Sequence, residues 1–334
     1  MDSATAGIRG TPNWSDLELR PLLEHISSNA LGRRVQLTAC EWRPSPFSTL
    51  FPAEILVLRL NGDETLSVFV KHLGSEQADH PEKQCRDREV RIYRDLLTDG
   101  GLPVPRCFGS RWNDETGRHE VFLEYLDDWN LKYHGLDHWF AAARRLADLH
   151  VHFAARAPDL AACDFLLRFD EQYLREWAER ALTAVADVAP ALTGRLRRVV
   201  ASYGRVWEIL STQPLTLVHN DLAPKNVIAD RSSDPARICF VDWEMAGLGC
   251  GMMDLVHLKY GLDPVNGEKM VAAYCAGLEG TSLLPASPRE VERLVAACEI
   301  HKIVYRLAFS KTWRLGPERV EEWISETERF ASLL

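Results

Sequence analysis

The segment from His219 to Asn226 has the residue types and spacing that best suit catalysis. It reads His-Asn-Asp-Leu-Ala-Pro-Lys-Asn, an HxDxxxxN pattern, and Asp242 follows within Val-Asp-Trp-Glu. Phosphoryl transfer needs a carboxylate that accepts or orients the proton of the attacking hydroxyl, and oxygen ligands that hold Mg²⁺ against the phosphates. Asp221 offers the carboxylate, and Asn226 and Asp242 offer the ligands. Asp and Asn also cap turns without any function, but the combined pattern favours catalysis.

A lysine within an apolar strand pattern suggests a second functional pair. Lys71 ends the run Val-Phe-Val-Lys, where an unpaired charge would be costly. Glu89 lies in the next predicted helix and is a suitable partner for an ion pair that holds Lys71 against the α- and β-phosphates of a nucleotide. The alternative is an edge-strand lysine with its ammonium in water. The HxDxxxxN segment favours the ion pair.

These motifs resemble the aminoglycoside phosphotransferase and choline kinase family, small-molecule kinases that share the two-lobed fold of protein kinases. The resemblance spans most of the chain, although only the HxDxxxxN segment and the Asp-Trp-Glu at Asp242 are specific. It implies an ATP-dependent O-phosphotransferase that uses Mg²⁺, with GTP as an alternative donor. The implied acceptor is a hydroxyl of a small molecule, either an antibiotic such as an aminoglycoside or an amino alcohol such as choline.

The same resemblance implies a role for each matching residue. Asp221 is the expected catalytic base, and Asn226 and Asp242 are the expected magnesium ligands. His219 and Asp254 are expected to support the catalytic loop. The residues expected to bind the nucleotide are the pair Lys71 and Glu89 and the hinge residues Glu124, Tyr125 and Leu126.

The loop that should cover the phosphates departs from the family pattern. Residues 43–52 contain three prolines and two serines but no glycine, so their backbone cannot easily follow a GxGxxG path. The hydroxyls of Ser48 and Thr49 are candidates to contact the phosphates instead, and a proline-stiffened connector is the alternative. This departure also raises a second possible function, a non-catalytic kinase-like protein that binds or sequesters a small molecule.

The acceptor is expected to bind beside Asp221 on the C-terminal lobe. Carboxylates there would suit an amine-bearing acceptor, and aromatic rings would suit a quaternary ammonium or a flat ligand. Residues of these types also serve as ordinary surface and packing residues, and the sequence leaves the acceptor open. The candidates are Asp127, Asp128, Trp129, Glu244, Glu299, Tyr305 and Trp313.

Two regions of different pattern must position these residues, and together they predict an α+β, two-lobed, protein-kinase-like fold. The expected N-terminal lobe, 1–123, has a small antiparallel sheet and one long helix, and a hinge at 124–128 leads to a mainly helical lobe at 129–334. The expected strands are 33–43, 54–61, 66–72 and 121–125, with a hairpin turn at 61–63 and a helix at 82–98. The expected C-terminal helices are 140–157, 169–188, 192–210, 288–313 and 317–330. Short strands at 215–219, 226–229 and 237–242 carry the catalytic residues.

Composition limits the classes of protein that fit. The 334 residues are 46% hydrophobic and carry a net charge of −9, which suits a globular protein and argues against nucleic-acid binding. The eight cysteines show no zinc-ligand spacing, and no apolar run approaches the ~18 residues that span a bilayer. No secretory leader is recognisable. We therefore expect a cytoplasmic protein that binds no membrane, with its oligomeric state open.

Overall fold

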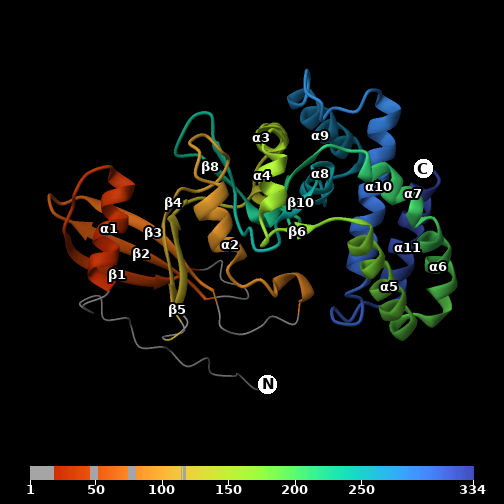
Figure 1. Cartoon of the computed structure of the whole chain (residues 1–334), viewed down its shortest axis with the longest axis horizontal. Coiled ribbons are helices and arrows are strands. Elements are labelled where there is room, and N and C mark those ends of the chain that lie inside the picture. Colours follow the sequence, from red (N-terminus) through yellow and green to blue (C-terminus); the bar gives the residue numbers. More distant parts are fainter. Residues whose placement is uncertain (1–18, 46–51, 74–79, 114, 116–117) are drawn as a thin grey trace. The chain divides into compact units, whose positions relative to one another are not determined.

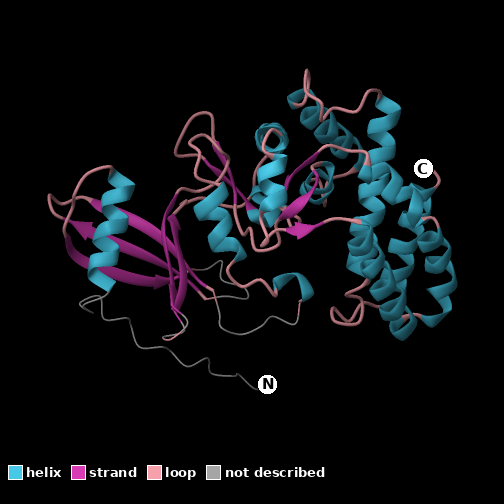
Figure 2. Cartoon of the chain, viewed as in Figure 1, coloured by secondary structure: helices cyan, strands magenta, loops and turns pink. Residues whose placement is uncertain are grey.

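The computed structural model describes residues 19–45, 52–73, 80–113, 115 and 118–334. The chain divides into two compact units, Met1–Asp127 and Asp128–Leu334. Ser48 and Thr49, the predicted phosphate contacts, lie outside the described residues. Strands predominate in the first unit and helices in the second (Figure 2).

The described strands of the first unit form an antiparallel sheet in the order β1-β2-β3-β5-β4 (Figure 1). They are β1 Leu37–Pro44, β2 Ala53–Leu60, β3 Thr65–His72, β4 Cys107–Asn113 and β5 Arg118–Glu124. The hairpin predicted between β2 and β3 is confirmed, because Gly62 and Asp63 both have positive φ, as a tight turn between twisted strands requires. β4 was not predicted.

Helix α1 (Leu19–Leu31) lies across one face of this sheet (Figure 1) and was also missed by the sequence analysis. Its buried positions Leu19, Leu23, Ile26 and Ala30 have helical spacing, so the signal was present in the sequence. These side chains join a core cluster with alternate residues of the strands, among them Val68. The apolar alternation of the strands is therefore explained by the helix that covers them.

The helix expected over residues 82–98 is wrong in its first half. The structure has a 3-10 turn at Pro81–Lys83 (η1), then α2 at Arg88–Arg91, which continues into a π-helical turn at Ile92–Leu96 (η2). The thiol of Cys85 donates to the carboxylate of Asp87, a local side-chain bond that competes with a continuous helix. Glu89 nevertheless lies on α2 and is buried.

The second unit is built mainly of helices. They are α3 Leu136–Ala154, α4 Ala157–Ala162, α5 Glu171–Val188, α6 Thr193–Ala201, α7 Tyr203–Ser211, α8 Met252–Leu258, α9 Pro264–Gly277, α10 Pro288–Leu307 and α11 Pro317–Ala331. The helix predicted over 192–210 is wrong as a single element, because Ser202 turns its hydroxyl onto the carbonyl of Val199 and separates α6 from α7. The helix predicted over 288–313 ends at Leu307, and α8 and α9 were not predicted.

Short strands interrupt these helices, as predicted. β6 Leu167–Arg168, β10 Gly247–Cys250 and β7 Leu215–Val218 pair in that order, while β8 Val227–Asp230 and β9 Arg237–Phe240 form a hairpin. Single 3-10 turns lie at η3 Leu131–Tyr133, η4 Pro190–Leu192 and η5 Pro224–Asn226. In the described part of the chain no helix combines the length and the apolar character required to cross a bilayer.

Candidate active site

The catalytic segment leaves β7 and turns sharply at His219 and Asn220. Asn220 has a φ of 65°, which an asparagine tolerates better than most residues. The His219 ring is buried, its Nε2–H donates to the carbonyl of Val241 at 2.9 Å, and the ring packs 4.6 Å from that of Trp243. The expected structural role of His219 thus has a physical basis, since its ring joins the loop before Asp221 to the chain beside Asp242.

The fully buried carboxylate of Asp254 holds this turn in place. Asp254, on α8, accepts the backbone N–H of His219 at 2.7 Å and that of Asn220 at 2.8 Å. His150 of α3 lies 3.3 Å from the same carboxylate through Nε2, and its Nδ1 lies 2.7 Å from the hydroxyl of Tyr274 on α9. With His150 Nε2–H donating to Asp254 and Nδ1 accepting from the Tyr274 hydroxyl, all of these groups have hydrogen-bond partners.

Asn226 fixes the side of Asp221 that faces the protein. Its amide Nδ2 donates to the main-chain carbonyl of Asp221 at 2.7 Å and to the carboxylate Oδ2 at 3.1 Å. The amide oxygen of Asn226 is thereby turned away from Asp221 and can serve a cation. Asn226 is buried, whereas a third of the Asp221 side chain is exposed. Asp221 is therefore held firmly yet remains accessible to a substrate.

Asp242 follows β9 instead of lying within a strand as expected. The Val241 N–H donates to the Asn226 carbonyl at 3.0 Å, so Asp242 is the next residue after the backbone partner of Asn226. Asp242 adopts a φ of 72°, and buried Trp243 anchors it by donating to the carbonyl of Phe240. Such an amide and carboxylate pair fits Mg²⁺, which often takes one or two protein ligands and binds substrate phosphates. No group of three His, Cys, Asp or Glu side chains suited to a metal occurs among the described residues.

In the first unit, the structure brings Lys71 and Glu89 together. Lys71 Nζ lies 2.7 Å from Glu89 Oε2, and the two side chains are only 13% and 2% exposed. Lys71 sits near the end of β3, while Glu89 sits on α2. At this burial an ammonium without a carboxylate would be strongly disfavoured, so Glu89 fixes the direction of the Lys71 side chain.

The expected hinge residues follow the end of β5. The Glu124 carboxylate accepts the N–H of Arg106 at 3.0 Å, and Leu126 is buried. The Tyr125 hydroxyl donates to Asp127 at 2.9 Å, which engages one of the predicted acceptor carboxylates. The side chains of these residues are thus engaged or buried, and their main-chain groups are the candidates for hydrogen bonds to a nucleotide.

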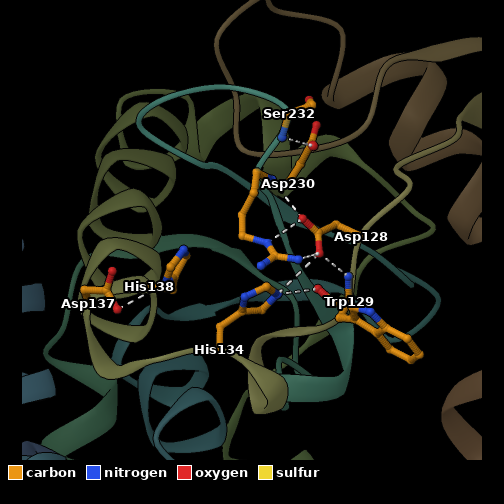
Figure 3. A network of polar contacts seen from close by, with 8 residues as sticks. Asp128, Trp129, His134, Asp137, His138, Asp230 and Ser232 are labelled. Carbon is orange, nitrogen blue, oxygen red and sulfur yellow. Dashed lines mark hydrogen bonds and ion pairs between the residues drawn. The ribbon is translucent and has the colours of Figure 1, made fainter.

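The segment from Asp128 to His134 is clamped against the β8–β9 hairpin (Figure 3). Asp128 accepts hydrogen bonds from the Trp129 N–H at 2.7 Å, from the Arg231 N–H at 2.9 Å, and from the Arg231 guanidinium. Partial burial acts to raise the pKa of Asp128, but the bonds from Arg231 and Trp129 outweigh it and lower the pKa to about 2. His134 adds a bond of 3.0 Å to the carbonyl of Trp129.

This clamp holds the chain segment that carries Trp129 and Tyr133 next to the catalytic segment. A β-bridge joins Asn130 to Ile228 of β8, and η3 packs against η5, the turn that contains Asn226. Trp129 and Tyr133 meet edge to face at 5.4 Å and are 55% and 62% exposed. Asp128 itself is occupied by Arg231, so its part is to hold Trp129 in place.

The acceptor candidates on the later helices differ in their surroundings. Glu299 is buried and forms ion pairs with Lys259 and Lys302, and Lys302 also donates to the Val256 carbonyl at the end of α8. Glu299 therefore compensates buried charge between α8 and α10 and is not kept as an acceptor candidate. Tyr305 packs 4.4 Å from Trp177 of α5.

Trp313 and Glu244 complete the predicted set. Trp313 stacks on Phe309 at 5.2 Å and is half exposed, so part of its face is available to a ligand. Glu244 follows Trp243 and is partly buried. Sequence reasoning assigned no role to His150, Tyr274 and Arg231, whose partners lie more than a hundred residues away. Lys225, which lies within the motif, was likewise assigned no role.

Known proteins resemble this chain in sequence. Residues 56–293 match the model of the phosphotransferase enzyme family. Ethanolamine kinase 2 of Mus musculus is 33% identical over 154 residues, which is 41% of this chain and 38% of the mouse protein. The match therefore spans about two fifths of the length of that relative.

Solved structures resemble the chain over much more of its length. A microcompartment-associated aminopropanol kinase superposes with a TM-score of 0.59 at 19% identity and covers 87% of this chain and 90% of its own. Choline kinase from Cryptosporidium parvum gives 0.54 at 13% identity, with 88% of each chain covered. A spectinomycin phosphotransferase in complex with ADP and spectinomycin gives 0.53 at 13% identity, with 89% and 92% covered. These likenesses show the kinase-like α+β fold, and with the matched family model they show that the chain belongs to the phosphotransferase enzyme family of small-molecule kinases.

Proposed function

We propose that the chain transfers the γ-phosphoryl group of ATP to a hydroxyl of a small molecule. The observation that carries this proposal is the state of Asp221, which is accessible, held by Asn226 through Oδ2, and placed on a turn that buried Asp254 braces. A general base needs such a fixed carboxylate with one oxygen open to the substrate. Membership of the phosphotransferase family supports the same reaction.

Each group then has a defined part in the transfer. Asp221 takes the proton of the acceptor hydroxyl as that oxygen bonds to phosphorus. Asn226 and Asp242 would hold Mg²⁺, which supplies positive charge against the phosphate oxygens. Lys71, directed by Glu89, forms charge-assisted hydrogen bonds with the α- and β-phosphates.

The nucleotide base is proposed to contact the main chain at Glu124, Tyr125 and Leu126, where GTP is the alternative to ATP. Complexes with AMP and with ADP among the similar structures support a nucleotide donor. Ser48 and Thr49 remain proposed phosphate contacts. A direct comparison of ATP and GTP as donors, at equal magnesium concentration, tests this assignment.

For the acceptor we infer an amine-bearing alcohol, because the named relatives include kinases of ethanolamine, aminopropanol and choline. The residues that would meet such a ligand are Asp127, Trp129, Glu244, Tyr305 and Trp313, since carboxylates and aromatic faces both attract cations. An antibiotic hydroxyl is the second class, favoured by the likeness to a spectinomycin phosphotransferase. We also infer a cytoplasmic location, where ATP is present and the eight free cysteines would stay reduced.

A turnover assay tests the function directly. Purified protein is given Mg·ATP with ethanolamine, 1-amino-2-propanol, choline or spectinomycin, and phosphorylated product is measured. We expect Asp221→Ala to lower kcat on the best acceptor by ~10²-fold or more, because the base is lost. Asp159→Ala, which changes a carboxylate that is 72% exposed on α4, is the matched control and should keep the wild-type rate.

Two outcomes would overturn the assignment. An Asp221→Ala variant with the wild-type rate would show that Asp221 is not the base. Calorimetry that finds tight binding of an acceptor but no affinity for ATP and Mg²⁺ would instead support the sequestering protein. Micromolar nucleotide binding would argue against that alternative.

A further inference from the structure

Lys225 is the charged residue of the HxDxxxxN segment to which the reaction above gives no part. It lies in η5, directly between Pro224 and Asn226. Its ammonium Nζ is 3.1 Å from Asp221 Oδ2, and its side chain is 57% exposed. The segment therefore places a lysine ammonium in contact with the proposed base.

The two oxygens of Asp221 are engaged unequally. Oδ2 accepts from Asn226 Nδ2 and also meets Lys225 Nζ, both at 3.1 Å. Within the described residues no donor reaches Oδ1. The hydroxyl of an acceptor is thus expected to approach Oδ1, while Lys225 stands on the opposite side of the same carboxylate.

An exposed ion pair usually contributes little, and the simplest interpretation of Lys225 is a solvated surface lysine. The chain offers a pair of that kind for comparison, Lys311 and Asp187, at 2.7 Å with 71% and 47% exposure. The difference is that Asp187 has no proposed part in the reaction, whereas Asp221 changes charge during it. When Asp221 accepts a proton it becomes neutral, and the attraction that held Lys225 disappears.

The reaction creates a new site for this cation at the same time. The acceptor oxygen bonds to the γ-phosphorus, its proton passes to Asp221 Oδ1, and the bond from phosphorus to the β-γ bridging oxygen breaks with its electron pair left on ADP. Negative charge on the transferred phosphoryl oxygens then lies beside a protonated Asp221. The Lys225 stem has four rotatable bonds and an exposed head, so its ammonium can follow that charge.

We propose that Lys225 is a second catalytic cation, which pairs with Asp221 in the resting enzyme and with the transferred phosphoryl group in the transition state. This inference rests on the proposed function. Lys225 keeps all three of its protons throughout, and its contribution is electrostatic. It is distinct from Lys71, whose ammonium is fixed by buried Glu89.

The test compares Lys225→Met, which removes the charge and keeps the length, with Lys225→Arg, which keeps the charge. Lys311→Met is the matched control from an exposed ion pair. For each protein we would measure kcat, KM for ATP and the acceptor, and the dissociation constant of MgADP with and without aluminium fluoride, a mimic of the phosphoryl group in transit. Thermal unfolding checks that each variant is folded.

We expect Lys225→Met to lower kcat about tenfold or more, as the loss of ~1.4 kcal/mol of transition-state stabilisation would do. Its affinity for MgADP alone should stay within about twofold of wild type, while the tightening by aluminium fluoride should fall by about the same factor as kcat. Lys225→Arg should recover most of both, and Lys311→Met should match wild type. A purely structural lysine would not separate the two dissociation constants.

The proposal is overturned if Lys225→Met keeps kcat and the full effect of aluminium fluoride. It is also overturned if Lys225→Arg is as impaired as Lys225→Met, because the charge would then not be the cause. Failure of the proposed function gives a different result, in which the wild-type protein phosphorylates no acceptor. Loss of turnover in Asp221→Ala without any effect of Lys225→Met would leave the function standing and reject this inference alone.

Discussion

Two aspartates of the second unit each organise a loop through backbone amides, but in opposite surroundings. Asp254 is fully buried, and its partners are the N–H groups of His219 and Asn220 and the ring of His150. Asp128 has a side chain that is 6% exposed, yet its main partner, Arg231, is 59% exposed. The first aspartate braces the catalytic loop, and the second clamps the segment that carries Trp129.

The difference shows that the loss in unfolding free energy on removing a carboxylate depends on whether water can reach the donors that it leaves behind. Around Asp254 no solvent can replace a lost partner, so each orphaned donor adds its own desolvation cost. At Asp128 water can solvate Arg231 when the carboxylate is removed, which limits the loss. The loop that bears the proposed base is therefore held by a fully buried carboxylate, that of Asp254.

The largest expected effect comes from Asp254→Asn. The new amide NH₂ would replace one accepting oxygen and face the backbone N–H of either His219 or Asn220, and we expect a loss of about 3 kcal/mol in the free energy of unfolding, together with near-complete loss of turnover. Urea denaturation and the turnover assay measure the two effects. A variant that keeps wild-type stability would break the comparison, because Asp254 would then be no more important than a surface anchor.

Tyr274→Phe tests the last member of the buried hydrogen-bonded series Asp254, His150 and Tyr274. Burial raises the pKa of Tyr274 well above its usual value, so the hydroxyl stays protonated and can donate to His150 Nδ1. Without it that nitrogen is buried and unpaired, and we expect a loss of about 1.5 kcal/mol in the unfolding free energy. Tyr260→Phe changes a ring that is 43% exposed and should lose almost nothing in the same urea experiment. Equal losses in the two variants would argue against the polar chain.

Asp128→Asn should have the smallest effect, about 1 kcal/mol at pH 7, because Arg231 is exposed. The pKa of Asp128 is lowered from 3.8 to about 2 in the folded protein, so its contribution is complete above about pH 4 and is lost as the pH falls towards 2. The difference between wild type and variant in the unfolding free energy should therefore be constant from pH 7 to pH 5 and shrink below pH 4. A difference that grows on acidification would contradict the assigned interaction.

Much of the fold was predictable where local patterns suffice. The strands of the N-terminal sheet and the α+β class followed from apolar alternation and turn residues, and the comparisons confirm the class and the family. The errors in the predicted helices occur where hydrogen bonds from local side chains interrupt a helix. Cys85 with Asp87 and Ser202 with Val199 each interrupt a helix that the apolar spacing alone would continue.

The residues of the candidate site likewise fall into those that local spacing predicts and those that depend on tertiary packing. Asp221, Asn226 and Asp242 lie close together in sequence, and a loop and one hairpin are enough to assemble them, so their spacing alone predicted them as candidates. The acceptor candidates did not share this property. Glu299 looked available on a helix, and only the packing of α8 against α10 showed that Lys259 and Lys302 occupy it.

By itself the sequence determined the family and the fold class, and it predicted the candidate catalytic residues, since these depend on residue types at fixed local spacing. Tertiary structure decided which groups support that chemistry, namely His150, Tyr274 and Arg231, because their partners lie 103 to 124 residues away along the chain. It also decided the environment of each charge. The physical reason is that burial and hydrogen-bond partners determine how strongly a charged group interacts with its neighbours, and both arise only when distant segments pack together.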